Sequence, residues 1–243
     1  MSGYVDFSRF YDALMEDVDY SRRASYVLKL FEMFSSKPKL LLDVGCGTGS
    51  FINEFMKSGI DCIGVDPSEE MLLMAREKCP KALFLNQSAE ELDLYGTVDG
   101  AVSLMDSLNH ITNPDAFSNS LSKVSLFLEP GALFIFDVNT KYKHKCILAD
   151  NSYVFEDENA LCIWRNCTDS DLVTEISLDF FVEKEDGSYE RFCDDFSERA
   201  YSDEYIKNEL KKAKLELVEI YDDLSFDKPK NDSQRVFYIA RKV

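Results

Sequence analysis

Hydrophobic positions change their period repeatedly between residues 40 and 140. Short apolar runs, typical of buried strands, alternate with segments in which apolar residues recur every three or four positions, as in helices. Strands separated by crossover helices indicate a mostly parallel sheet with helices on both faces. The expected strands are Leu40–Val44, Cys62–Val65, Ala82–Leu85, Val98–Met105 and Ala132–Val138, and the expected helices are Phe51–Lys57, Glu69–Lys78 and Asp115–Leu128.

The pattern changes near residue 150. Ile176, Leu178 and Phe180 alternate with polar residues, which is typical of a strand with one buried face. We therefore expect an α/β core formed by residues 1–150 and 201–243, with an antiparallel insertion over 151–200 that covers the site. The insertion is expected to hold three strands, Val154–Cys167, Leu172–Glu183 and Tyr189–Ala200. The core is then completed by a helix over Asp203–Lys214 and by strands at Glu216–Tyr221 and Arg235–Ala240. The spacing of apolar positions over residues 7–34 predicts one or two amphipathic helices.

Composition narrows the choice of partners. The 243 residues include 45 Asp and Glu against 27 Lys and Arg, giving a formal charge of −18. Such a surface repels phosphate backbones, so nucleic acid and anionic membranes are not expected partners. The N-terminal segment lacks a basic leader, no apolar run approaches a membrane span, and seven cysteines form no C-x-x-C pair, so we expect a cytoplasmic protein. With two histidines and no clustered cysteines, no metal site is expected.

The segment from Leu40 to Ser50 carries the strongest chemical signal, because a buried strand runs through a turn with glycine at 45, 47 and 49 into a helix. Glycine allows such a turn to bend sharply and to approach a ligand closely. Asp66 ends the next strand, 21 residues after Gly45, where a carboxylate can bond a ribose diol. A dinucleotide fold would require G-x-G-x-x-G, but Ser50 stands where the third glycine belongs.

The spelling Asp43-x-Gly45-x-Gly47-x-Gly49, followed by Asp66, resembles motif I and its acidic partner in the class I S-adenosylmethionine-dependent methyltransferases. The resemblance covers most of the chain. It implies a Rossmann-like, seven-stranded, mostly parallel sheet with helices on both faces and a small antiparallel β insertion as a lid. It also implies S-adenosyl-L-methionine as co-substrate, without a metal.

The resemblance assigns roles to individual positions. Asp43, Gly45, Cys46, Gly47 and Gly49 would hold the methionine moiety and Asp66 the ribose. Pro67, Met71, Ser88 and Ala89 would surround the adenine, and Met105 and Asp106 would lie where the methyl group meets the acceptor. His110 is the best-placed proton acceptor, with Tyr11 and Asp106 as lesser candidates. The combined features are similar to amino-sugar N-methyltransferases, which implies a small-molecule acceptor, an amine among the candidates.

Several of these residues also suit structural roles. Asp66 with Pro67 and Glu69 forms a good helix start, and Ser88-x-x-Glu91 matches a capping box. Met71 fits a core position, and His110 fits a hydrogen-bonded structural imidazole. The second histidine, His144, lies in a lysine-rich run that predicts a solvated loop, and the pair Asp194-Asp195 is expected to face water.

Two other functions compete with methyl transfer. One is an NAD(P)-dependent oxidoreductase, which Ser50 disfavours. The other is a non-catalytic nucleotide-binding module that uses the insertion for protein docking. Exposed rings in the insertion would favour the module, whereas rings that wall a pocket beside the glycine turn would favour catalysis; the rings are Trp164, Phe180, Phe181, Tyr189, Phe192 and Phe196.

Overall fold

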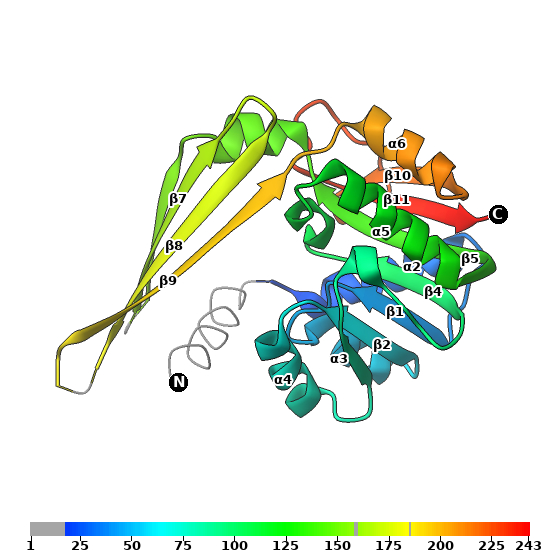
Figure 1. Cartoon of the computed structure of the whole chain (residues 1–243), viewed down its shortest axis with the longest axis horizontal. Helices are drawn as coiled ribbons and strands as arrows, with labels where there is room; N and C mark the ends of the chain where they lie inside the picture. Colours follow the sequence, from blue (N-terminus) through cyan, green and yellow to red (C-terminus); the bar gives the residue numbers. More distant parts are fainter. Residues whose placement is uncertain (1–17, 158–159, 185) are drawn as a thin grey trace.

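The computed structural model describes residues 18–157, 160–184 and 186–243. Seven strands form one central sheet in the order β10-β11-β5-β4-β1-β2-β3 (Figure 1). Strands β1 to β5 run parallel to one another. Strand β11 runs antiparallel to both of its neighbours, β5 and β10. The strands are β1 (Leu40–Val44), β2 (Asp61–Asp66), β3 (Leu83–Asn86), β4 (Val98–Ser103), β5 (Leu128–Asn139), β10 (Leu215–Asp222) and β11 (Arg235–Lys242).

Helices connect these strands, as the sequence pattern predicts. Side-chain caps fix several helix starts: Ser68 accepts a bond from the Met71 amide, and Asn113 accepts from the amides of Asp115 and Ala116. The helices are α2 (Tyr20–Met33), α3 (Ser50–Lys57), α4 (Glu69–Lys78), α5 (Pro114–Phe127) and α6 (Asp203–Lys212), with short helical segments at Ala89–Glu91, Ser107–His110 and Lys143–Leu148.

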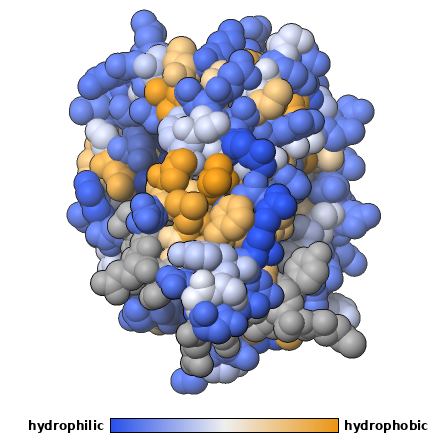
Figure 2. Space-filling model, turned by 90° about the vertical axis from the view of Figure 1, so that its left-hand side faces the viewer, coloured by the Kyte–Doolittle hydropathy of each residue, from blue (hydrophilic) through white to orange (hydrophobic). Residues whose placement is uncertain are grey.

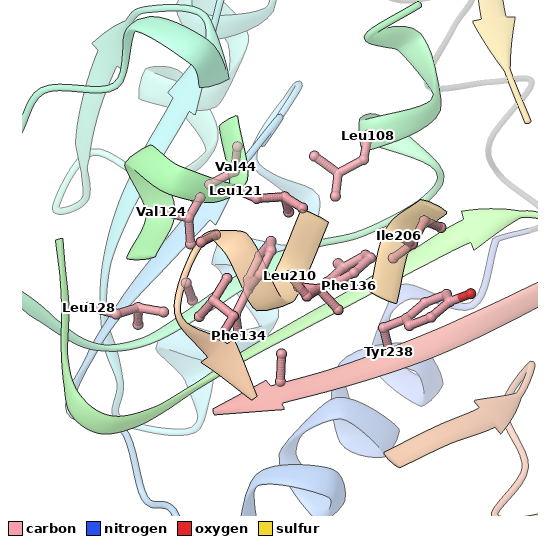
Figure 3. Packing of buried hydrophobic residues seen from close by; sticks show 14 of the residues in the cluster. Val44, Leu108, Leu121, Val124, Leu128, Phe134, Phe136, Ile206, Leu210 and Tyr238 are labelled. Carbon is pink, nitrogen blue, oxygen red and sulfur yellow. The ribbon is translucent and has the colours of Figure 1, made fainter. Parts of the chain in front are cut away.

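Both faces of the central sheet are buried. On one face, Phe136 stacks on Tyr238 with ring centroids 5.1 Å apart, and α5 and α6 cover them with Leu121 and Leu210 (Figure 3). On the other face, α2, α3 and α4 pack a second apolar cluster that includes Phe55. The seven-stranded α/β class expected from the sequence is therefore confirmed. No helix among the described residues has the length and apolar character that a membrane span requires.

The insertion holds four strands, so the expectation of three strands was wrong. They are β6 (Ser152–Asp157), β7 (Ala160–Thr168), β8 (Val173–Glu183) and β9 (Tyr189–Arg199), joined in that order as an antiparallel sheet, here called sheet B. The single strand expected at Val154–Cys167 is two strands that pair with each other. The sequence contains no glycine or proline there, so periodicity alone gave no sign of the break.

The two faces of sheet B differ in character. One face carries the buried Leu178 and Phe180 with the partly buried Phe196, and this face contacts the Ser107–His110 segment of the core. The opposite face presents Val154, which is 64% exposed. Figure 2 looks onto this outer side and shows an apolar patch flanked by hydrophilic side chains. The register places Ile163 opposite Val154 on that face.

Candidate functional site: the carboxyl ends of the parallel strands

The turn after β1 has the left-handed backbone that its glycines were expected to supply, with φ of +76° at Gly45, +52° at Gly47 and +75° at Gly49. Gly45 is also packed closely, because a Cβ there would lie 2.6 Å from the Ser107 Cβ. The Ser107 hydroxyl donates a 3.1 Å bond to the Gly45 carbonyl oxygen. The turn therefore packs tightly against the segment that follows β4. The side chain of Cys46, in the same turn, is buried.

Two observations fit a polar ligand at this turn. A Cβ at Gly47 would meet no atom within 4 Å, so the space beside this residue is open. The Oδ2 atom of Asp43 is buried without a hydrogen-bond partner among the described residues. Burial and the neighbouring Asp66 raise the pKa of Asp43 to about 7. A ligand that brings a cation or a hydrogen-bond donor to this corner would satisfy that oxygen.

Asp66 lies across the turn at the end of β2. It accepts 2.9 Å bonds from the amides of Gly47 and Ser68. Burial raises its pKa, while these bonds and the charge of His110 act in the opposite direction. The N-cap of α4 is Ser68, so the alternative interpretation of Asp66 as the cap was wrong. Asp66 instead ties the glycine turn to the start of α4.

The residues expected around an adenine lie along the same edge. Pro67 is exposed beside Asp66, and Met71 is partly buried on α4. Ser88 and Ala89 follow β3, and the Ser88 hydroxyl donates a 3.2 Å bond to the Glu91 carboxylate. The hydroxyl does not cap the short helix, so the capping-box interpretation was wrong in that respect.

The loop after β4 is strained, because Met105 and Asp106 both have positive φ, at 55° and 57°. Such a conformation costs roughly 1–3 kcal/mol for each residue unless the surroundings hold it. Asp137 at the end of β5 accepts bonds from both amides, at 3.1 and 2.7 Å. Arg235 at the start of β11 in turn donates to Asp137 at 2.9 Å and to Asp106 at 3.1 Å.

Buried charges surround this loop. Burial acts to raise the pKa of Asp106, but the charges of Arg235, Lys143 and His110 and the bond from Arg235 together outweigh it and lower that pKa to about 2. Asp106 also accepts a bond from the Asn139 amide, and the Asn139 oxygen accepts a 2.9 Å bond from Lys143. Asp106 is therefore a fixed anion and an unsuitable proton acceptor.

His110 ends the short helix after this loop and is half exposed. Its ring lies 5.2 Å from that of Phe196, and its Nε2 lies 3.9 Å from Oε1 of Glu198 on β9. Burial raises the pKa of both Asp66 and Asp194, and the charge of His110 acts in the opposite direction on each. His110 therefore lies between the glycine turn and the inner face of sheet B.

Two surface predictions need correction. His144 is fully buried, because the lysine-rich run folds into the short helix Lys143–Leu148, and its Nδ1 lies 2.8 Å from the Thr174 hydroxyl. Burial lowers its pKa to about 4. Asp194 is only partly exposed and faces the His110 side, whereas its neighbour Asp195 is exposed as expected.

Comparison with known proteins identifies this arrangement. The methyltransferase-domain family matches residues 41–131. A protein of Geobacillus sp. (strain WCH70) that bears the name methyltransferase is 32% identical over 246 residues, covering 98% of this chain and 99% of that protein. The chain belongs to the S-adenosylmethionine-dependent methyltransferases. The sequence-based enzyme class is confirmed.

Two further relatives extend the comparison with this methyltransferase. The crystal structure of an S-adenosylmethionine-dependent methyltransferase from Clostridium acetobutylicum ATCC 824 matches with a TM-score of 0.90 and 28% identity, covering 98% of both chains. The dTDP-3-amino-3,4,6-trideoxy-alpha-D-glucopyranose N,N-dimethyltransferase of Streptomyces venezuelae is 29% identical over 133 residues, which is 54% of this chain and 56% of that enzyme.

The methyltransferase fold gathers most of the predicted site residues at one edge of the sheet. Tyr11 lies outside the described residues. Sequence analysis missed Asp137, Asn139, Arg235 and Glu198, which hold the loop after β4. For two of them a signal existed, since Asp137 and Asn139 interrupt an apolar run at the end of its strand. Among the described residues, no group of three or more His, Cys, Asp and Glu side chains could hold a metal ion.

Proposed function

We propose that this methyltransferase transfers a methyl group from S-adenosylmethionine to a small-molecule amine, with His110 as the proton acceptor. The observation that carries the proposal is the position of His110. Its ring lies 5.2 Å from that of Phe196 on the inner face of sheet B, and it is near enough to Asp66, at the end of β2, for its charge to act on that carboxylate. An acceptor bound there would have its nitrogen beside both the donor and a base.

On the donor side, the open space at Gly47 and the unpartnered oxygen of Asp43 support binding of the methionine moiety at the glycine turn. Asp66 would exchange its bond to the turn for the ribose hydroxyls. The remaining positions proposed to contact the donor are Gly45, Cys46 and Gly49 at the turn, Pro67, Met71, Ser88 and Ala89 around the adenine, and Met105 and Asp106 near the methyl group.

Methyl transfer from a sulfonium donor requires few catalytic groups from the protein. Bound S-adenosylmethionine supplies an electrophilic methyl carbon on a positive sulfur. Alignment of acceptor, carbon and sulfur can therefore lower the activation barrier by roughly 7–11 kcal/mol. An amine, however, arrives as its ammonium and must lose a proton before attack. His110 is the candidate to take that proton, because histidine is the side chain most often used as a general base.

Charge and shape support a cationic acceptor. Asp194 and Glu198 flank the ring of Phe196 on the inner face of sheet B, and their carboxylates favour an ammonium over an anion. The Streptomyces venezuelae relative is an N,N-dimethyltransferase of an amino sugar, which agrees with this choice. We propose that residues 151–200 cover the acceptor, with Tyr11 as a second polar group at the same site.

The rings of the insertion bear on the docking-module alternative. Phe180 is buried, while Trp164, Phe192 and Phe196 are partly buried on the inner face. Tyr189 is 60% exposed. Most of the rings thus lie on the side that faces the core, which supports catalysis over a surface built for docking.

Titration calorimetry with S-adenosylhomocysteine tests the donor site. Asp66→Ala should weaken binding at least about tenfold, the equivalent of roughly 1.4 kcal/mol for a lost charged hydrogen bond. Asp61→Ala, at the exposed opposite end of β2, is the matched control and should bind like the wild type. Absence of binding by the wild type at hundred-micromolar ligand would refute the donor site.

A methyl-transfer assay with labelled S-adenosylmethionine tests the acceptor class. Amino sugars and simple aliphatic amines should become labelled, whereas matched hydroxyl compounds should not. His110→Ala should lower turnover by about 10²-fold or more, as expected for loss of a general base, and leave S-adenosylhomocysteine affinity nearly unchanged. Labelling of hydroxyl compounds alone would exclude the amine, and unchanged turnover in the variant would exclude His110 as base.

A further inference from the structure

Glu198 is a buried carboxylate at the point where β9 leaves sheet B and returns to the core. It is 5% exposed, and both of its oxygens have defined neighbours. Oε1 lies 3.9 Å from Nε2 of His110, and Oε2 accepts a 2.9 Å bond from the side-chain amide of Asn139. Burial of a carboxylate costs free energy unless the group is paired and hydrogen-bonded.

The core fixes the position of Glu198. Asn139, at the end of β5, directs its side-chain amide group to both Glu198 and Asp106, and its oxygen accepts a 2.9 Å bond from Lys143. The backbone of β9 is held beside it, because the side-chain amide of Asn109 donates a 2.8 Å bond to the carbonyl of Arg199. Glu198 therefore keeps its place relative to the loop after β4.

Of the two histidines near Glu198, only His110 is suited to carry charge. His144 Nε2 lies 3.7 Å from Oε2, but that ring is fully buried, and burial with the charge of Lys143 lowers its pKa to about 4. His144 is thus neutral at physiological pH. His110 is half exposed and can take up a proton without losing its hydration.

We propose that Glu198 is a positioning residue for His110, which holds the imidazole with Nε2–H directed at its carboxylate so that Nδ1 is left free to receive the proton of the acceptor. The role rests on the proposed function of His110 as base. During transfer, the proton moves from the ammonium to Nδ1, the freed nitrogen lone pair forms the bond to the methyl carbon, and the carbon–sulfur bond breaks to leave a neutral thioether. The Glu198 carboxylate, held by the Asn139 amide, stabilises the imidazolium that forms.

Several charged groups face His110 from the elements packed around it. Asp66 lies at the end of β2, Asp106 in the loop after β4, and Asp194 and Glu198 on β9. Lys143, which faces Glu198 and Asp106, has the opposite charge. Among the described residues, Glu198 alone has a carboxylate oxygen within 4 Å of a His110 ring nitrogen, so its removal should have the largest effect.

The test is an NMR titration of the histidine rings, which is simple here because the chain contains two histidines. The His110→Gln variant assigns the signals. In Glu198→Gln, the pKa of His110 should fall by about half a unit or more, because an anion beside the ring favours its charged form. Asp195→Asn, on the same strand but exposed, is the matched control and should leave that pKa within about 0.2 units. An unchanged His110 pKa in a folded Glu198→Gln protein would overturn the proposal.

A second measurement uses the unaltered protein, in case the variant fails to fold. The ¹³C signal of the Glu198 carboxylate should show a step at the pKa of His110, and His110→Gln should abolish this step. Absence of the step in the wild type would equally overturn the proposal. Failure of amine methylation would refute the proposed function and leave these titrations unaffected, so the two failures can be told apart.

Kinetics with an amine that turns over provide the functional readout. Glu198→Gln should lower kcat by about tenfold with a smaller change in KM, and should shift the acid limb of the pH profile of kcat downward by the same amount as the NMR pKa. Glu198→Asp, which keeps the charge, should restore the acid limb. A variant that loses kcat with an unmoved limb would show a purely structural role and contradict the proposal.

Discussion

Gly45 and Gly47 share a left-handed backbone but differ in what surrounds them. Gly45→Ala should destabilise the protein by about 2 kcal/mol or more, because the new Cβ would strike Ser107 as well as adopt an unfavourable φ. Gly47→Ala should cost only about 1 kcal/mol, since its Cβ meets no protein atom, yet should weaken S-adenosylhomocysteine binding. Urea unfolding and calorimetry measure the two effects. Gly96→Ala, with open space and no positive φ, is the control for stability, and equal losses at positions 45 and 47 would contradict this assignment.

Asp43 should make stability fall as the pH rises. Its folded-state pKa of about 7 lies above the ordinary value of 3.8, so the folded protein keeps a proton that the unfolded chain releases. Stability from this group is therefore full below pH 4 and is lost between about pH 4 and 7, up to about 4 kcal/mol. Asp43→Asn has no ionisable group at this position, so its stability should not fall in the same way. The difference in free energy of unfolding, variant minus wild type, should therefore increase from pH 5 to pH 8 when measured by urea unfolding. A constant difference would show that Asp43 is ionised throughout.

At the residue scale, sequence reasoning succeeds where a local pattern controls the outcome. The positive φ at Gly45, Gly47 and Gly49 follows from the motif itself. The burial of His144 does not, because it depends on Thr174 from a strand 30 residues away. The same limit applies to Glu198, whose partner Asn139 comes from β5. Long-range polar contacts leave no periodic signal in the chain.

Among the elements, the core helices and strands were predicted with small shifts at their ends, because crossover connections force a regular alternation of period. Helix α4 begins and ends where expected, at Glu69–Lys78. Sheet B was predicted in character but not in strand number. Its β6 edge carries the apolar Val154 and Phe155 in an exposed position, which the rule of alternating burial does not anticipate.

Sheet B should unfold as a unit with its own small core. Phe180→Ala removes a ring that is 2% exposed and should destabilise this sheet by about 3 kcal/mol. Trp164, the one tryptophan of the chain, lies in β7 and reports on this sheet alone. The fluorescence transition should therefore move to lower urea more than the far-UV circular dichroism transition. Val154→Ala, on the exposed face, should move neither, and equal shifts of both signals in Phe180→Ala would show a single cooperative unit.

Across the whole molecule, the seven cysteines are free and differ in accessibility. Cys146 and Cys167 are exposed and should react quickly with a thiol reagent. Cys193 is exposed as well, but its thiol donates to Asp179, which raises its pKa, so it should react more slowly. The other four thiols are buried and should react only on unfolding. Kinetics with Ellman's reagent, with and without denaturant, measure the classes; a fourth reactive thiol in the folded protein would contradict the burial pattern.

The path of β9 has a consequence for how this protein can diverge. One end of the strand carries Phe192 and Asp194 on the face turned toward the proposed acceptor site, and the other end carries Glu198, which is bonded to the core. If the proposed acceptor site is correct, substitutions in the outer half should change which compound is methylated and leave His110 and the donor site undisturbed. Descendants of one ancestor should keep the anchored end and vary the distal end, so that new substrate ranges arise while the reaction is inherited intact.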